Sequence, residues 1–227
     1  MSNCFLASNC NKKDCDKDFC LRKYKMESLY SAALMTDAQK QHITLRVDED
    51  GTDLEQFKQL ASIEQNIMSF VSEGKNLYLH SANCGNGKSS WSIRLIEAYF
   101  NKIWARTDSR CRALFISVPR FLLALKDNIS NKNSYVDYIK DNVFEADLVI
   151  WDDIAAKMGS EFELTHLLNI IDNRLALGKA NIYTSNLNRQ QLYTALGDRL
   201  TSRIANMSLD IELFGADKRV LKLEAKQ

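Results

Sequence analysis

Residues 76–90 read NLYLHSANCGNGKSS, and this stretch decides the fold. It begins as a short apolar strand, continues through a turn with two glycines, and leads into a segment typical of a helix. A glycine-rich turn between a strand and a helix is the context in which phosphate-binding loops occur. The glycines let backbone N–H groups face phosphate oxygens, and the following helix N-terminus favours a bound anion. The stretch therefore predicts a P-loop nucleotide site.

Individual residues of this loop have predicted roles. Lys88 is expected to reach the β- and γ-phosphates, and the hydroxyl of Ser89 is expected to bind Mg²⁺. Ala82 stands where the motif G-x-x-x-x-G-K-[ST] has its first glycine, so a chance glycine turn is the alternative when the motif is taken alone. The predicted nucleotide-binding residues are Asn83, Cys84, Gly85, Asn86, Gly87, Lys88, Ser89 and Ser90.

A second motif, DLVIWDD at residues 147–153, ends an apolar run with two acids. A buried parallel strand delivers such acids to its carboxyl end, the edge at which open α/β sheets bind ligands. We expect Asp152 to hold the Mg²⁺ shell and Asp153 to polarise or deprotonate the attacking water. Either acid alone is also consistent with an ordinary strand that runs into an acidic turn. The two motifs together predict ATP binding and hydrolysis.

Strand-like and helix-like segments alternate along the chain, which implies a parallel sheet with helices on both faces. We therefore predict an α/β fold with a five-stranded parallel sheet. Helices are predicted at 21–40, from 52 or 53 to about 72 with a stop at Gly74, from the P-loop to about 104, from Pro119 onward, at about 134–145, and at about 161–177 with a stop at Gly178. The predicted strands are 76–81, 112–118, 147–153, 180–186, and 209–214 together with 219–224.

Two later stretches complete an ordered set of motifs. They are HLLNIIDNRLALGKANIYTSNL, residues 166–187, and LGDRLTSRIANMSLDIEL, residues 196–213. With the two motifs above, they make residues 55–221 resemble AAA+ ATPases of the DnaC/DnaI helicase-loader and IstB group. Loaders of Gram-positive bacteria and their phages are similar to this chain in carrying a cysteine-rich N-terminal module, so a loader of that type is expected. The resemblance implies an AAA+ core without a full C-terminal lid.

The resemblance also implies roles for single residues. Asn186 would be the sensor amide that detects the γ-phosphate and orients water, with Ser185 adjacent to it. Arg219 falls where the loaders have a late arginine and is the candidate for the sensor 2 role. Asp153 departs from the more usual glutamate, and the shorter side chain predicts slow hydrolysis.

By the same resemblance, Arg203 would be the arginine finger that completes the nucleotide site of a neighbouring copy, with Arg199 as the second candidate. This role implies self-association into an AAA+ oligomer. The alternative is an intramolecular salt bridge of Arg203, for instance to Asp198 or Glu212, because surface pairs of this kind are common.

The N-terminal segment is unusually rich in cysteine. Four thiols lie within 17 residues, a segment too short to form an apolar core of its own. They favour a Zn²⁺ site, although their spacing is wider than in standard zinc motifs. Unligated thiols in a tail are the alternative. The charged stretch at 46–53 reads as a linker, so we predict a module at 1–50 and an ATPase domain at 51–227. The loader resemblance implies that the module binds a replicative helicase, a DnaB-type hexamer. The predicted zinc ligands are Cys4, Cys10, Cys15 and Cys20.

The overall charge and hydropathy narrow the possible functions. The formal charge is +1, so nucleic-acid binding requires a local basic strip. No apolar run is long enough to span a bilayer, and no signal peptide is recognisable, so we expect a cytoplasmic protein without a membrane partner. A single-stranded DNA track is predicted across the two helices between the second and third strands, with Arg120, Lys126, Lys132 and Lys140 as basic residues and Phe121, Tyr135 and Tyr138 as stacking residues. Solvated surface lysines are the alternative.

These expectations combine into one leading hypothesis, an ATP-dependent loader of a replicative helicase. An IstB-like transposition ATPase shares the same core and is the second candidate. The cysteine-rich module favours the loader. A nucleotide-gated adaptor that does not hydrolyse ATP is the third candidate, and the set Lys88, Asp152, Asp153, Asn186 and Arg203 argues against it.

Overall fold

The computed structural model of the chain describes residues 4–6, 10, 19–41, 45–47, 51–108, 110–129, 131–156, 159–215 and 217. Cys15, Arg219 and the predicted strand at 219–224 lie outside these residues. None of the described helices has the length and apolar character needed to span a bilayer.

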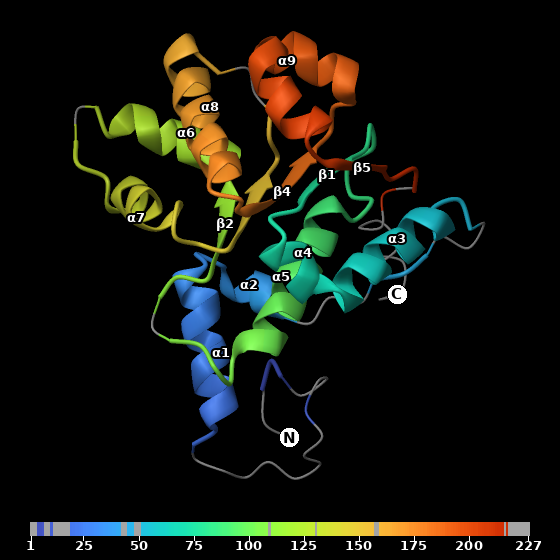
Figure 1. Ribbon diagram of the computed structural model, residues 1–227, viewed down its shortest axis with the longest axis vertical. Coiled ribbons are helices and arrows are strands. Elements are labelled where there is room, and N and C mark those ends of the chain that lie inside the picture. Colours follow the sequence, from blue (N-terminus) through green and yellow to red (C-terminus); the bar gives the residue numbers. More distant parts are fainter. Residues whose placement is uncertain are drawn as a thin grey trace, which may run out of the picture.

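Five parallel strands form one sheet at the centre of the molecule, in the order β2-β3-β4-β1-β5 (Figure 1). β1 leads into the P-loop, β3 ends in the first of the two acids, and β4 lies between these two strands. The central strands are buried on both faces, so β3 is almost entirely apolar, whereas β4 also buries the polar side chains of Asn181, Thr184 and Ser185. The predicted parallel sheet is confirmed. Its strands are β1 Asn76–His80, β2 Ala113–Ser117, β3 Leu148–Asp152, β4 Ala180–Ser185 and β5 Leu209–Glu212.

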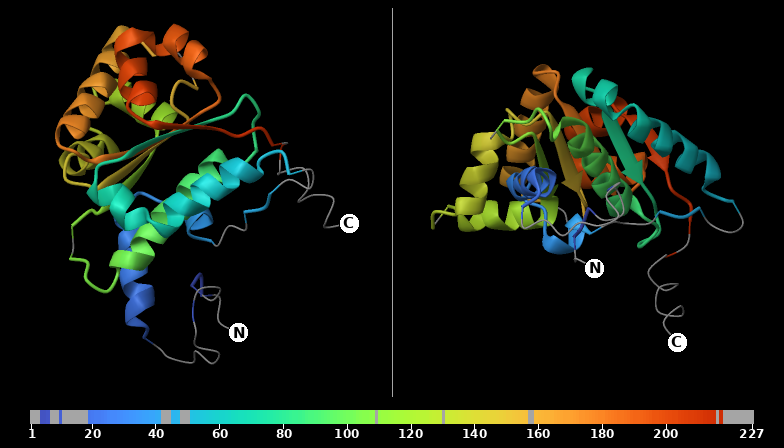
Figure 2. Two further views of the ribbon diagram at one scale, coloured as in Figure 1. Left: turned by 45° about the vertical axis from the view of Figure 1, so that its right-hand side comes forward. Right: turned by 90° about the horizontal axis from the view of Figure 1, so that it is seen from below.

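Helices cover the sheet on both faces, each group over its own hydrophobic core (Figure 2). Alternate strand residues point to opposite faces, so Leu79 and Phe115 belong to one core, whereas Tyr78 and Trp151 belong to the other. The first core lies under α1 Leu21–Ala32, α3 Leu54–Gln65, α4 Ile67–Ser72 and α5 Lys88–Ile103. The second lies under α6 Val118–Asp127, α7 Ser134–Asn142, α8 Glu161–Ala176, α9 Arg189–Thr201 and the π-helical turn η2 Ser202–Asn206.

The predicted single helix at 21–40 is wrong. α1 ends at Ala32, and a short helix, α2 Asp37–Lys40, follows a turn in which Leu34 has a positive φ of 62°. This turn lets the carbonyl of Ala33 accept a hydrogen bond of 2.8 Å from the N–H of Phe115 on β2. Because β2 is an edge strand, its outward N–H groups need such partners. The hydrogen bond to the edge strand β2 therefore favours the end of α1 at this point, although the local sequence pattern is helical.

α1 packs directly on the core of the ATPase fold. Met26, Leu29 and Tyr30 are buried there, and the ring of Tyr30 meets that of Phe100 on α5 edge-on at 5.5 Å. The hydroxyl of Tyr138 on α7 donates to the carbonyl of Ala32 at 2.9 Å. The predicted domain boundary at residue 50 stays a prediction. Although α1 precedes this boundary, its contacts are with the ATPase fold.

Two helices end at glycines that lie against each other. Gly74 follows α4 and Gly178 follows α8, both with positive φ, of 63° and 64°, which only glycine adopts without strain. A Cβ at Gly74 would collide with the backbone carbonyl of Gly178. The predicted stops at both glycines are confirmed, and the two glycines lie just before the paired strands β1 and β4.

A fully buried arginine ties α8 to the sheet. The guanidinium of Arg174 donates to the carbonyls of Val143, Ala146 and Ala180 and to the side-chain oxygen of Asn181. Burial lowers the pKa of Arg174 to about 10, so the group stays charged at neutral pH. Its acceptors are carbonyl oxygens, which satisfy the donors without a carboxylate. The arginine is therefore a structural element of the α8–β4 unit.

Candidate nucleotide site

The P-loop has the conformation that its glycines predict. Gly85 and Gly87 have positive φ values of 75° and 109°, and α5 begins at Lys88. Ala82 is not among the described residues with positive φ, so alanine is tolerated at the first motif position. Lys88 is buried, and its Nζ donates to the carbonyl of Asn83 at 2.9 Å. The ammonium group is thus held over the loop that it is expected to serve.

The segment after β5 lies against this loop. The side-chain amide of Asn86 donates to the carbonyl of Leu213 at 3.1 Å, and that of Asn83 donates to the carbonyl of Gly215 at 3.4 Å. The carboxylate of Asp217 fills the space that a side chain at position 85 would occupy. The glycine there is therefore required by a close approach as well as by its φ, and an acidic group lies beside the predicted phosphate site.

The structure brings the two predicted Mg²⁺ residues together. The hydroxyl of Ser89, in the first turn of α5, donates to Oδ1 of Asp152 at 2.8 Å. Asp152 ends β3, and burial raises its pKa, while hydrogen bonds from Ser89 and Thr184 act in the opposite direction. A hydroxyl beside a carboxylate is a donor set that suits Mg²⁺, which prefers oxygen ligands and usually binds through few protein groups. These residues therefore fit the predicted metal.

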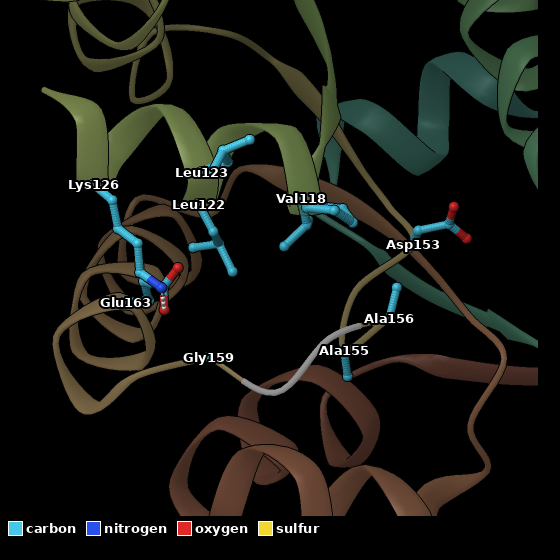
Figure 3. A pocket seen from close by; sticks show the side chains of 10 residues that line it. Val118, Leu122, Leu123, Lys126, Asp153, Ala155, Ala156, Gly159 and Glu163 are labelled. Carbon is cyan, nitrogen blue, oxygen red and sulfur yellow. Dashed lines mark ion pairs between the residues drawn. The ribbon is translucent and has the colours of Figure 1, made fainter.

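Asp153 has an unusual backbone conformation. Its φ is 58°, in the left-handed region that aspartate tolerates better than most residues. Its N–H donates to Oγ1 of Thr184 at 2.9 Å. The side chain lies at the rim of a small cavity between α6 and α8, and the carboxylate points away from Leu122 and Glu163 (Figure 3). The acid is thus presented outward from the end of the sheet.

Thr184 is a site residue that the motifs did not reveal. It is fully buried on β4, the strand beside β3, and its hydroxyl donates to Oδ1 of Asp152 at 2.8 Å. The register sets Trp151 opposite Tyr183, so Asp152 falls beside Thr184. The register between β3 and β4 cannot be deduced from the sequence of either strand alone, so the sequence gives no signal for this role of Thr184. Asn186 follows β4 directly and is partly exposed.

Arg203 lies away from the P-loop, on the turn η2. Its side chain is 45% exposed and forms an ion pair with Asp172 on α8. The partner is therefore neither Asp198 nor Glu212, the acids considered from the sequence. Arg199 is also exposed. The assignment of an arginine finger stays a prediction.

The cysteines of the N-terminal segment are only partly described. Cys4, Cys10 and Cys20 are each partly buried, and Cys15 lies outside the described residues. Among the residues that the structure describes, no three histidine, cysteine or acidic side chains gather as a metal site. The zinc site therefore stays a prediction.

Three of the four predicted DNA-contacting cations already have partners. The guanidinium of Arg120 lies over the ring of Tyr135 at 4.5 Å. Lys126 pairs with Glu163 at 3.2 Å and Lys132 with Asp137 at 3.7 Å. These contacts place the groups on α6, α7 and the loop between them, and DNA binding by them is untested.

The architecture and the site define the class of the chain. A P-loop on β1, acids at the end of β3 and a strand inserted between the two are the features of a P-loop ATPase fold of the AAA+ type. The fold class predicted from the sequence is confirmed.

Within this class the chain is similar to the replicative helicase loader DnaC of Escherichia coli strain K12. The two are 26% identical over 139 residues, which are 61% of this chain and 51% of DnaC. The chain thus spans about half the length of the curated relatives it matches. No family model matches it.

Solved structures share the fold. A primosome component from Streptococcus pyogenes serotype M3 has a TM-score of 0.64 at 22% identity, covering 86% of this chain and all of that one. A DnaC helicase loader has 0.59 at 18%, covering 82% and 98%. The initiator DnaA bound to AMPPCP and single-stranded DNA has 0.56 at 20%, covering 77% and 51%. The predicted resemblance to DnaC-type loaders is confirmed, and the Gram-positive or phage type stays a prediction.

Proposed function

We propose that this chain is an ATP-dependent loader of a replicative DNA helicase. The observation that carries the proposal is the hydrogen bond between Ser89 of the P-loop and Asp152 of β3, because it unites the two halves of a Mg²⁺–nucleotide site. The similarity to DnaC, which is named as a replicative helicase loader, supplies the biological role.

Each site residue has a defined part in the proposed hydrolysis. The backbone N–H groups of the loop and Lys88 hold and orient the phosphates. Ser89 and Asp152 would hold Mg²⁺, which supplies positive charge to the phosphates when bound. Asp153 accepts the proton of the attacking water or polarises it, and Asn186 orients that water. Arg203 of a neighbouring copy completes the charge around the γ-phosphate in the proposed oligomer.

The proposed partners follow from the same role. The helicase would be a DnaB-type hexamer that binds the N-terminal module, and single-stranded DNA would bind along α6 and α7. The DnaA neighbour is described as bound to single-stranded DNA and AMPPCP, which supports both ligands for this fold. Arg120 stacked on Tyr135 offers a flat surface of the kind on which bases stack. ATP binding would tune the assembly, and hydrolysis would release it.

The zinc site belongs to the same proposal. Cys4, Cys10, Cys15 and Cys20 would hold one Zn²⁺ per chain and give the short N-terminal segment a fixed shape for helicase binding. Metal analysis of protein purified without added zinc is expected to give one zinc per chain. A content near zero, with all four thiols free to react, rejects the site.

A turnover assay with a binding assay tests the function. The parent chain is expected to hydrolyse ATP slowly, to change its rate when single-stranded DNA is added, and to co-purify with a DnaB-type helicase. Lys88→Ala is the matched control, because it removes the phosphate-binding charge and is expected to abolish nucleotide binding while leaving the fold intact. ATP binding without any turnover would favour the non-hydrolysing adaptor, and no association with a helicase would overturn the loader.

A further inference from the structure

Thr184 joins the two acids of the site from the neighbouring strand. We propose that Thr184 is a positioning residue that sets the relative placement of Asp152 and Asp153, and so couples Mg²⁺ binding to water activation. The inference rests on the proposed ATPase function, which it deepens by naming the residue that arranges the site.

The hydrogen-bond directions at this hydroxyl are fully determined. The N–H of Asp153 can only donate, so Oγ1 of Thr184 accepts it, at 2.9 Å. The hydroxyl hydrogen is then free to go to Oδ1 of Asp152, at 2.8 Å. The side chain of Thr184 therefore binds both the carboxylate of Asp152 and the backbone N–H of Asp153.

The carboxylate of Asp152 is oriented by two hydroxyls at once. Ser89 and Thr184 both donate to Oδ1, each at 2.8 Å, from α5 and β4 respectively. Neither of these bonds engages Oδ2. The two bonds restrict the rotation of the carboxylate through its Oδ1 atom, and Oδ2 would be available to a bound metal ion. Without Thr184, only Ser89 orients the group, and Ser89 is itself expected to turn toward the metal.

The backbone of the second acid is held from the same strand. Asp153 has a φ of 58°, a conformation that needs support from its surroundings. The carbonyl of Thr184 accepts the N–H of Ile154 at 2.8 Å, and the hydroxyl of Ser185 donates to the carbonyl of Ile154 at the same distance. The two bonds to Ile154 therefore anchor the residue after the left-handed turn. At Asp153 itself, the carbonyl accepts the N–H of Ala156 at 3.1 Å, and the N–H is held by the threonine hydroxyl, which is the side-chain contribution to the turn.

Replacing the hydroxyl alone separates this role from packing. Thr184→Val keeps the branched shape but removes both hydrogen bonds, whereas Thr184→Ser keeps the hydroxyl and loses a methyl group. Thr201 on α9 supplies a matched control, because it is a buried threonine whose hydroxyl has no hydrogen-bond partner among the described residues. Thr201→Val makes the same chemical change away from the acids.

The test is a Mg²⁺ titration of fluorescent ATP binding, repeated in EDTA, with ATP turnover and thermal melting measured on the same samples. We expect Thr184→Val to need about ten-fold more Mg²⁺ for half-maximal binding, because a hydrogen bond to a charged group is lost. Its binding in EDTA is expected to match the parent, and its kcat is expected to fall. Thr184→Ser and Thr201→Val are expected to behave like the parent.

A Thr184→Val chain that keeps the parent Mg²⁺ dependence overturns the proposal. If that variant does not fold, a comparison of Thr184→Cys with Thr184→Ser takes its place. These two variants differ only in a thiol, which forms weak hydrogen bonds, and a hydroxyl, which forms strong ones. Equal Mg²⁺ dependence of the two variants would also overturn the proposal. A parent chain that binds no Mg²⁺–ATP instead refutes the proposed function, so the two failures are distinguished by the parent titration.

Discussion

Asp152 and Asp153 are adjacent in sequence but are held in different ways. The carboxylate of Asp152 is half-buried and bonded to two hydroxyls, whereas that of Asp153 points outward from a left-handed turn. We expect Asp153→Asn to keep ATP binding but stop turnover, because asparagine adopts the same turn yet cannot take a proton. Asp152→Asn is expected to weaken Mg²⁺-dependent binding instead. Nucleotide titration and a turnover assay on both variants, each compared by thermal melting, distinguish the two roles. Parental turnover by Asp153→Asn would show that another group is the catalytic acid.

Asp217 places a second negative charge near the P-loop. Its carboxylate lies against Gly85, so a bound phosphate would meet a like charge. Asp217→Asn is therefore expected to bind ATP several-fold more tightly than the parent, measured by nucleotide titration at low salt. The difference should shrink as salt is added, because the charge of the partly exposed Asp217 is screened by ions, with a screening length of about 10 Å at 0.1 M ionic strength. An equal affinity of the two chains at low salt would contradict the expected repulsion.

The proximity of Ser89 and Asp152 could be predicted because each lies within a short motif, one at a helix start and one at a strand end that meet at the same edge of the sheet. The chemical roles assigned to these residues and to Lys88 stay predictions. Thr184 was not predicted, because its role depends on the register between β3 and β4. Asp217 was missed for a similar reason: it is remote from the loop in sequence and reaches it only through the path of the chain after β5.

Gly74 and Gly178, at the ends of α4 and α8, have the same backbone conformation but different surroundings, so we expect alanine to destabilise the protein to different extents at the two positions. Gly178→Ala is expected to lower the free energy of unfolding by about 1–2 kcal/mol, the cost of a left-handed non-glycine residue. Gly74→Ala has the same φ and also places its methyl group against the carbonyl of Gly178, so it is expected to cost clearly more. Urea denaturation of the two variants measures the difference. Equal losses would show that the backbones can move apart freely.

The elements were predicted best where burial alone decides them. The short apolar runs at β2 and β3 favour strands inside a covered sheet, and the structure has strands there. The helix expected at 21–40 failed at Leu34, because the carbonyl of Ala33 pairs with β2 instead of continuing the helix. Local periodicity carries no information about a sheet edge formed by residues far along the chain.

The proposed assembly can be tested by mixing two inactive chains. Arg203 lies on η2, where it pairs with Asp172 of α8. If Arg203 serves a neighbouring copy, a mixture of Arg203→Ala and Lys88→Ala chains is expected to recover part of the ATPase rate, because an intact P-loop then meets an intact arginine. Arginine fingers supply about 10³–10⁵ in rate in the best-studied GTPases.

The control for this experiment is Asp172→Ala. If Arg203 acts only through its ion pair within one chain, Asp172→Ala should reproduce the loss seen with Arg203→Ala, and mixing should restore nothing. Light scattering on the mixture must show co-assembly. Absence of recovery in a co-assembled mixture would rule out a finger in trans.

Arg174 has a consequence for the order in which the chain folds. Its guanidinium carries a full charge whose acceptors lie in the segment before β3 and at the start of β4. A charge removed from water before these carbonyls are in place is strongly unfavourable. We therefore expect α8 to bury its inner face only when both segments have come together, so that this half of the sheet forms cooperatively around the arginine. Replacing Arg174 is therefore expected to lower the folding rate as well as the free energy of unfolding.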